Sequence, residues 1–257
     1  MNVEVQNVVF ACPGNTPVSY ERGARPLAVF YADLLGMRIA REDWFVLENE
    51  NEPGGLNLAF GDGPSDYRPP RWPDSEHPQQ MHLDLSVDNL DDAEREATKL
   101  GASKLQDNGS FRVYADPAGH PFCLYAADED RTGNAGHVRI ERVVIDCFSP
   151  RTLADFYAVL LDMPERELDT PQRVVIAGTD GRLPALAFQH AQFPAPRWPD
   201  PAYPQQVHLY LRVLNPDTAR IHAAQELAER LGAIQLAVGH GGRDRSIGVR
   251  LRTLGVE

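Results

Sequence analysis

The chain has 257 residues, of which 42% are hydrophobic and 24% charged, and its formal net charge is −12 at pH 7. This length suits two domains of ordinary size, each able to bury its own core. The negative charge, with no cluster of Lys and Arg between aromatic residues, argues against a nucleic-acid partner. Apolar runs stay well short of the roughly 20 residues that a membrane span requires. We therefore expect neither nucleic acid nor membrane as a partner.

Two features indicate a cytoplasmic protein. Residues 1–4 lack the basic segment that precedes the apolar stretch of a secretory signal. The three cysteines, Cys12, Cys123 and Cys147, are too few and too scattered for a disulfide framework or a CxxC zinc motif. A reducing compartment suits such a chain.

The first elements alternate between strand and helix signals. Residues 8–12 form an apolar, β-branched stretch that predicts a buried strand. In residues 27–35 apolar side chains recur at helical spacing, which predicts a helix that ends at Gly36. Short strands are expected after it at 37–41, 44–47 and 56–60, between Gly, Pro and Asn residues.

The next elements repeat this order. Residues 81–87 alternate between apolar and polar side chains, which predicts a strand whose polar face carries His82 and Asp84. A second helix is expected from Asn89 to Gly101. Strands at 111–114 and 122–125 then flank Asp116-Pro-Ala-Gly119, a sequence that suits a type I turn.

The chain is an internal repeat with a shift of 126 residues. Segment 70–85 matches segment 196–211 at 11 of 16 positions, including Pro-Arg-Trp-Pro-Asp, and the apolar helix stripe recurs at 153–161. We therefore expect a first domain at 1–128, a charged, Gly-rich linker at 129–136 and a second domain at 137–257.

The second copy departs from the first near its end. After Leu236 it carries neither the Asp-Pro-x-Gly turn nor the closing Phe-Cys-Leu strand of the first copy. We interpret this as an altered or incomplete C-terminal hairpin, and a change of reading frame is one hypothesis for it.

Three motifs in this order carry a family resemblance: FYADLLGM on the first helix, HLDLSVDNLDDAEREATKLGA in the second half and DPAGHPFCL at the end. They resemble the glyoxalase/bleomycin resistance/dioxygenase superfamily, the vicinal oxygen chelate fold, and most of all its uncharacterised glyoxalase-like branch. The resemblance implies an α+β fold of tandem domains. Each domain has two βαβββ modules that form a curved mixed sheet around a cup, with the helices outside. Because the superfamily includes lyases, isomerases, dioxygenases, thiol transferases and metal-free drug-binding proteins, the fold does not settle the function.

The resemblance also implies four metal-ligand positions on the strands that line the cup. The residues at these positions are Gln6 or Asn7 and Glu141 or Arg142 at the first, Asn57 and Ala185 at the second, His82 and His208 at the third, and Cys123, in place of the usual Glu, at the fourth. Only the third position keeps a typical ligand, whereas a divalent ion normally needs at least three. We therefore expect no cofactor, and keep as an alternative a divalent metal, such as zinc held by Gln6, His82 and Cys123.

The pair of His82 and Asp84 is the candidate catalytic group. Two residues apart on one strand, they share a face, so Asp84 can orient His82 as a general base. The other interpretation is a histidine bonded for structural reasons. The second copy keeps His208 but has Tyr210 in place of Asp84, so an active pair would localise activity to residues 1–128.

Other candidates line the expected cup. Trp72 could stack on a ligand, and Arg71 could pair with a carboxylate. Both copies keep these residues, however, which favours a structural connection, or strap, between the modules. The same reasoning applies to Gln80. Cys123 either lines the cup or packs in the core.

These observations predict a cytoplasmic protein that binds a small molecule in the cup of the first domain without the usual metal. The alternative is a metal-dependent lyase or dioxygenase acting on a substrate with adjacent oxygens, so whether the chain is an enzyme stays open. Oligomeric state is also open, and pairing of the two copies within the chain is one alternative. The expected ligand-binding residues are Arg71, Trp72, Gln80, His82, Cys123 and His208.

Overall fold

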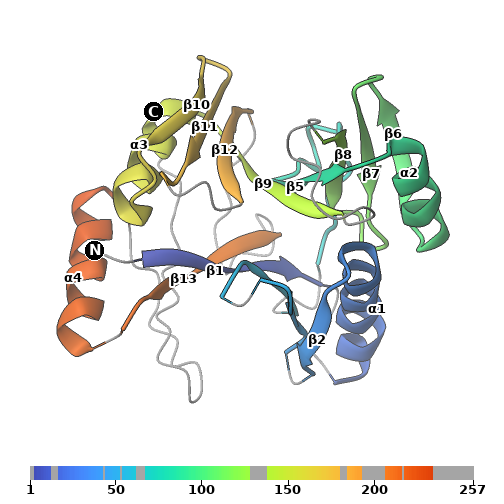
Figure 1. Ribbon diagram of the computed structural model, residues 1–257, viewed down its shortest axis with the longest axis horizontal. Helices are drawn as coiled ribbons and strands as arrows, with labels where there is room; N and C mark the ends of the chain where they lie inside the picture. The colour runs from blue at the N-terminus through green and yellow to red at the C-terminus, as the bar shows by residue number, and fades with distance from the viewer. Residues whose placement is uncertain are drawn as a thin grey trace.

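In the residues that it describes, the computed structural model has two β-sheets, with four helices at the two ends of the molecule (Figure 1). Helices α1 and α2 lie at one end, and α3 and α4 at the other. No helix of the described part is long and apolar enough to cross a membrane. The structure describes residues 3–12, 17–42, 44–52, 54–61, 67–127, 138–179, 184–192, 206–215 and 217–233.

The elements fall into four modules, each beginning with a strand and a helix. Module 1 consists of β1 (Val3–Ala11), α1 (Pro17–Leu35), β2 (Arg38–Arg41), β3 (Val46–Glu48) and β4 (Asn57–Gly61). Module 2 consists of β5 (Met81–Val87), α2 (Leu90–Lys99), β6 (Ser103–Asp107), β7 (Phe111–Ala115) and β8 (Pro121–Ala126). Module 3 consists of β9 (Arg139–Cys147), α3 (Pro150–Leu161), β10 (Glu165–Asp169), β11 (Arg173–Ala177) and β12 (Ala185–His190). The described part of module 4 consists of β13 (Val207–Val213) and α4 (Thr218–Arg230).

Local sequence signals set some of these ends as expected, although α1 begins at Pro17, before the expected residue 27. Helix α1 stops before Gly36, whose φ of 64° lies in the left-handed region that favours glycine. The side chain of Asn89 caps α2 by accepting hydrogen bonds from the backbone N–H groups of Asp91 and Asp92. The predicted turn at 116–119 also forms, since the N–H of Gly119 donates to the carbonyl of Asp116 at 2.9 Å.

Both sheets combine strands from the two copies. The five-stranded sheet has the order β13-β1-β4-β3-β2 and joins modules 4 and 1, whereas the eight-stranded sheet has the order β10-β11-β12-β9-β5-β8-β7-β6 and joins modules 3 and 2. The antiparallel pairing of β5 with β9 spans Met81–Ile145 to Ser86–Arg139. The α+β fold of βαβββ modules is thus confirmed. A site confined to residues 1–128 is not confirmed, because one edge of β5 pairs with β9 of the second copy.

In the first copy, modules 1 and 2 belong to different sheets and contact each other through side-chain packing. Phe30 and Tyr31 on α1 lie against Phe122 on β8, with ring centroids 5.9 and 6.5 Å apart. The hydroxyl of the fully buried Tyr31 donates to Asp116 of the β7–β8 turn. Helix α1 of module 1 is therefore attached to the sheet that contains module 2.

The linker at 129–136 and the altered end after Leu236 lie outside the described residues. The same holds for the second Pro-Arg-Trp-Pro-Asp segment, 196–200. The predicted boundaries of the two domains, 1–128 and 137–257, remain predictions.

Candidate functional site

The side chains of strand β5 point alternately to the two faces of the eight-stranded sheet. Leu83 and Leu85 belong to the main core, on the side of the helices. His82, Asp84 and Ser86 alternate with them and therefore lie on the opposite face, called the inner face below. His82 is 6% exposed and Asp84 is fully buried. A buried carboxylate needs charged or hydrogen-bonding partners.

The partner of Asp84 comes from the second copy. Nη2 of Arg173, on β11, donates to Oδ2 of Asp84 at 2.8 Å, and Nη1 donates to Oε1 of Gln189 at 3.1 Å. Nε2 of His82 lies 3.4 Å from Oδ1 of Asp84. Burial alone would raise the pKa of Asp84, but His82 and Arg173 outweigh it and hold this pKa below its ordinary value. Asp84 is thus kept as a buried anion.

A second buried carboxylate, Asp146 on β9, behaves in the opposite way. Burial raises its pKa, although the charge of His82 and hydrogen bonds from Gln79 and Gln189 partly oppose the shift. Asp146 has no contact to a guanidinium like that of Asp84 with Arg173 among the ion pairs of the described residues. The inner face therefore holds two acids whose environments move their pKa values apart.

Strand β8 adds a thiol and a phenol to this face. Cys123 is the neighbour of Asp84 in the parallel ladder, and Tyr125 that of Ser86. Burial, followed by the charge of Asp84, raises the pKa of both Cys123 and Tyr125, so thiol and phenol keep their protons at neutral pH. The Tyr125 ring stacks on that of Phe111, with centroids 4.9 Å apart.

The similarity of this chain to known proteins identifies its family. The model of the glyoxalase-like domain matches residues 18–125 and 142–252, well over half of the chain. The chain belongs to the glyoxalase-like domain family. The structure resembles a "putative dioxygenase" from Bacillus subtilis subsp. subtilis str. 168, with a TM-score of 0.57, 16% identity, and coverage of 91% of this chain and 77% of that one. It also resembles glyoxalase I from Zea mays, with a TM-score of 0.56, 12% identity, and coverage of 94% and 85%. No curated protein matches.

At these identities the solved structures show only the fold that this glyoxalase-like chain shares with them. The second matched region extends to residue 252, past Leu236 where the two copies diverge. The tandem arrangement expected from the repeat is confirmed by the two matched regions.

The metal implied by the resemblance can be tested against this glyoxalase-like site. Donor atoms of His82, Asp84 and Cys123 lie within 4.8 Å of one another, and all three residues are buried. The guanidinium of Arg173 already contacts Asp84, however. A divalent ion on Asp84 would lie roughly 4 Å from it, where charges of +2 and +1 repel by about 8 kcal/mol at an effective dielectric constant of about 20. With Arg173 in this position, the residues do not fit a divalent metal.

The zinc set considered from the sequence is divided between the two sheets. Gln6 lies on β1 in the five-stranded sheet, whereas His82 and Cys123 lie in the eight-stranded one. The sequence missed the residues of the second copy that contribute to the inner face beside Asp84. Arg173, Asp146 and Gln189 follow no motif, and only knowledge of the β5–β9 pairing identifies them.

His208 lies in the other sheet. It sits on β13 opposite Val9 of β1, and its ring centroid is 5.3 Å from that of Tyr210. Tyr210 in turn meets Trp44 at 5.3 Å, edge to face. The structure therefore separates His208 from His82, although the two residues are equivalent in the repeat.

The remaining candidates lie at the connection between modules. Arg71 is exposed and Trp72 half-buried, in a tight loop where the N–H of Asp74 donates to the carbonyl of Arg71 at 2.7 Å. Gln80 is buried, and its Oε1 accepts a hydrogen bond from the N–H of Gln206 at 2.9 Å. Gln80 and Gln206 are equivalent in the repeat, so these contacts support the strap interpretation.

His120 is engaged in a buried network away from the inner face. Its Nδ1 lies 3.0 Å from Oδ2 of Asp116, and its Nε2 lies 2.6 Å from the hydroxyl of Tyr67. Asp116 also accepts the hydroxyl of Tyr31. His120 is therefore not a base for Cys123, and the network joins module 1 to the β7–β8 turn.

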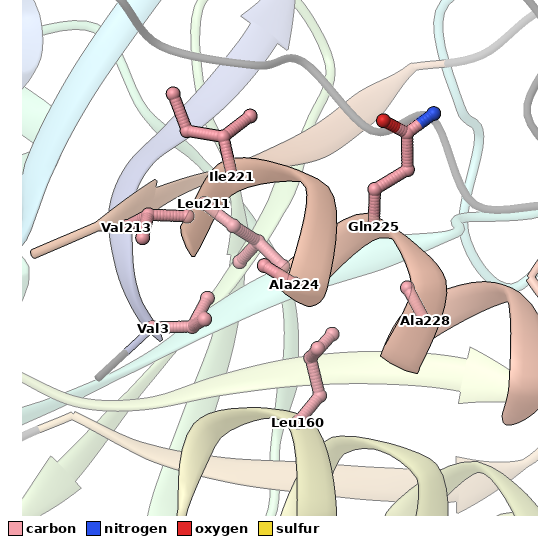
Figure 2. Close-up of a pocket in the computed structure, with 8 residues that line it drawn as sticks. All are labelled: Val3, Leu160, Leu211, Val213, Ile221, Ala224, Gln225 and Ala228. Carbon is pink, nitrogen blue, oxygen red and sulfur yellow. The ribbon is translucent and has the colours of Figure 1, made fainter. Parts of the chain in front are cut away.

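A small apolar pocket of about 30 Å³ lies on the helix side of the five-stranded sheet (Figure 2). Ala224 and Ala228 of α4 lie across it from Leu160 of α3 and Val3. Gln225 is the one polar residue of its lining, so this pocket offers no groups for chemistry.

Proposed function

We propose that this glyoxalase-like chain binds a small organic molecule on the inner face of the eight-stranded sheet, without a divalent metal. One observation carries the proposal. Nδ1 of His82, Oγ of Ser86 and Oδ1 of Asp146 are buried without a hydrogen-bond partner among the described residues, and Oδ1 of Asp84 beside them is met by Nε2 of His82 at 3.4 Å. Each such atom costs about 1–3 kcal/mol. Three of them on two adjacent strands support a place where a ligand supplies the missing partners.

The surroundings of these three atoms indicate what kind of molecule would fit. On one side, small apolar side chains of β9, β11 and β12 form a separate buried cluster that includes Val144, Val175 and Ala187. On the other side stand the stacked rings of Phe111 and Tyr125. A ligand with an apolar or aromatic body and central hydrogen-bonding groups matches this arrangement.

Chemistry by His82 would use Asp84 as its positioning partner. The separation of 3.4 Å between Nε2 and Oδ1 supports this role. Asp84 is also held by Arg173, which fixes the carboxylate. We keep His82 as the proposed general base for any reaction that the bound molecule undergoes.

The cluster of His82, Asp84 and Cys123 favours a second candidate, a metal-dependent lyase or dioxygenase acting on adjacent oxygens. The contact of Arg173 with Asp84 argues against it.

The three cysteines are free and buried, which supports a cytoplasmic location for the protein.

A thermal-shift screen of small organic molecules, with and without a chelator, tests the proposal. Ligands should raise Tm by mass action in both conditions, and the increase should disappear in His82→Gln. His208→Gln, the equivalent change in the other sheet, is the matched control and should keep it. Loss of the response in His208→Gln alone would place the ligand in the five-stranded sheet. A bound equimolar metal whose removal lowers Tm would favour the metal-dependent candidate.

A further inference from the structure

His82, Asp84 and Cys123 of the first copy form a potential metal site, and the guanidinium of Arg173, from the second copy, lies against it. His82, Asp84 and Cys123 offer donor atoms within 4.8 Å of one another. Three protein ligands are the number found in catalytic zinc sites, and imidazole, carboxylate and thiolate all bind zinc. Arg173 reaches the same carboxylate at 2.8 Å and is held from the other side by Gln189 at 3.1 Å.

We propose that Arg173 is a built-in cation that keeps this site free of metal, and that removing its guanidinium turns His82, Asp84 and Cys123 into a site for zinc or cobalt. The inference rests on the metal-independent binding proposed above. It goes beyond that proposal in naming the residue that excludes the ion and the latent ligands that it suppresses.

The balance of charge supports this role. In the structure, the guanidinium of Arg173 already neutralises the carboxylate of Asp84. A divalent ion with Cys123 as thiolate would leave one surplus positive charge in a buried site, which is costly. Without the guanidinium, the same ion, carboxylate and thiolate are neutral together. Arginine suits this task because its guanidinium does not deprotonate in proteins.

The geometry gives the exclusion a second basis. Gln189 on β12 and Asp84 on β5 hold two nitrogens of one planar guanidinium, so that its position is fixed from both sides. Strands β11 and β12 belong to module 3, and β5 to module 2. The equivalent of Asp84 in the other sheet is Tyr210, which offers no carboxylate. This pairing of a guanidinium with a potential metal ligand is therefore specific to the eight-stranded sheet.

The test is a Co²⁺ titration of the full chain followed by absorbance, with Zn²⁺ calorimetry in parallel. Wild type should show no saturable equimolar binding. Arg173→Met should bind one equivalent, roughly 100-fold more tightly or better, with a thiolate-to-cobalt band in the near ultraviolet. The double variant Arg173→Met/Cys123→Ser should lose the band.

Arg142→Met is the matched control. The Arg142 side chain, on β9, has the same 26% exposure as that of Arg173, but its ion pairs with Glu141 and Glu167 are long, at 3.8 Å. It should titrate like wild type. If Arg173→Met does not fold, Arg173→Gln retains a hydrogen-bond donor for Asp84, and a Zn²⁺-dependent rise in Tm of either variant reports the same site.

Two outcomes overturn the inference in different ways. The latent site is refuted if Arg173→Met folds but binds no Co²⁺. It is also refuted if Arg173→Met does not fold and Zn²⁺ raises the Tm of neither Arg173→Met nor Arg173→Gln. Both results leave metal-independent ligand binding intact. Wild type that binds one equivalent with the thiolate band refutes both the exclusion by Arg173 and the metal-independent function.

Discussion

The guanidinium of Arg173, from the second copy, lies 2.8 Å from the fully buried carboxylate of Asp84, from the first. This contact crosses from module 3 to module 2 and fixes a negative charge on the inner face of the eight-stranded sheet. It makes the candidate site a joint product of the two copies. Stability and ligand binding should therefore respond to the same residues.

Arg173→Met should lower the free energy of unfolding by roughly 3 kcal/mol, because it leaves Asp84 as a buried charge without its guanidinium partner. The value is at the low end of the usual range since about a quarter of the Arg173 side chain is exposed, at 26%. Urea denaturation at pH 7 measures the loss. Arg142→Met, equally exposed but with ion pairs of 3.8 Å, should cost less than about 1 kcal/mol. Equal losses in the two variants would contradict the role of the contact.

Asp84→Asn should destabilise the chain in a pH-dependent way. The pKa of Asp84 is below its ordinary value in the folded state, so the ionised carboxylate stabilises the fold above the unfolded pKa of about 3.9. This contribution is lost as the pH falls through the folded pKa. The difference in unfolding free energy between wild type and variant should be largest near pH 7 and shrink below about pH 4. A difference independent of pH would show that the charge of Asp84 is not what matters.

Asp146→Asn should act in the opposite direction. Because burial raises the folded pKa of Asp146 above its unfolded value, ionisation costs folding energy once the pH exceeds about 4. The penalty grows until the pH passes the folded pKa and is constant above it. The amide variant avoids this penalty, so it should be more stable than wild type at pH 7 and close to it at pH 3.5 or so. The same denaturation series detects this, and a destabilised variant at pH 7 would contradict it.

Local signals were enough to predict most elements of the first copy. The strand at 81–87, the helix start near Asn89 and the turn at 116–119 depend on neighbours in sequence, and all three are confirmed. Strand β1 begins at Val3, earlier than the predicted residue 8, because its first half is only partly buried and lacks a continuous apolar run.

The pairing of modules could not be derived in this way. A repeat of 126 residues is equally compatible with sheets formed within each copy or between them, since every module carries the same alternation of apolar and polar residues. The site depends on that choice. His82, Asp84 and Cys123 were found because they share one copy, whereas Arg173 and Asp146 enter only through the pairing of β5 with β9.

The shared sheets predict that neither copy folds alone as a monomer. Residues 1–127 without the second copy would expose the edge of β5 that pairs with β9 and the edge of β1 that pairs with β13. Unpaired edges of this length associate with other chains or fail to form a stable sheet. We expect residues 1–127 and 138–257, produced separately, to be unfolded or self-associated, and to form a 1:1 complex when refolded together.

Size-exclusion chromatography with light scattering and thermal denaturation by circular dichroism measure this outcome. The control is the same pair of fragments carrying Gln80→Ala, which removes the acceptor of the Gln206 N–H. Since an unpaired buried N–H costs about 1–3 kcal/mol, the complex should form less tightly. A monomeric first fragment with its own cooperative transition would contradict the topology, because only sheets confined to one copy permit such a monomer. Recovery of the complex, together with ligand binding sensitive to both His82→Gln and Arg173→Met on separate fragments, would instead mean that the two copies build one site between them.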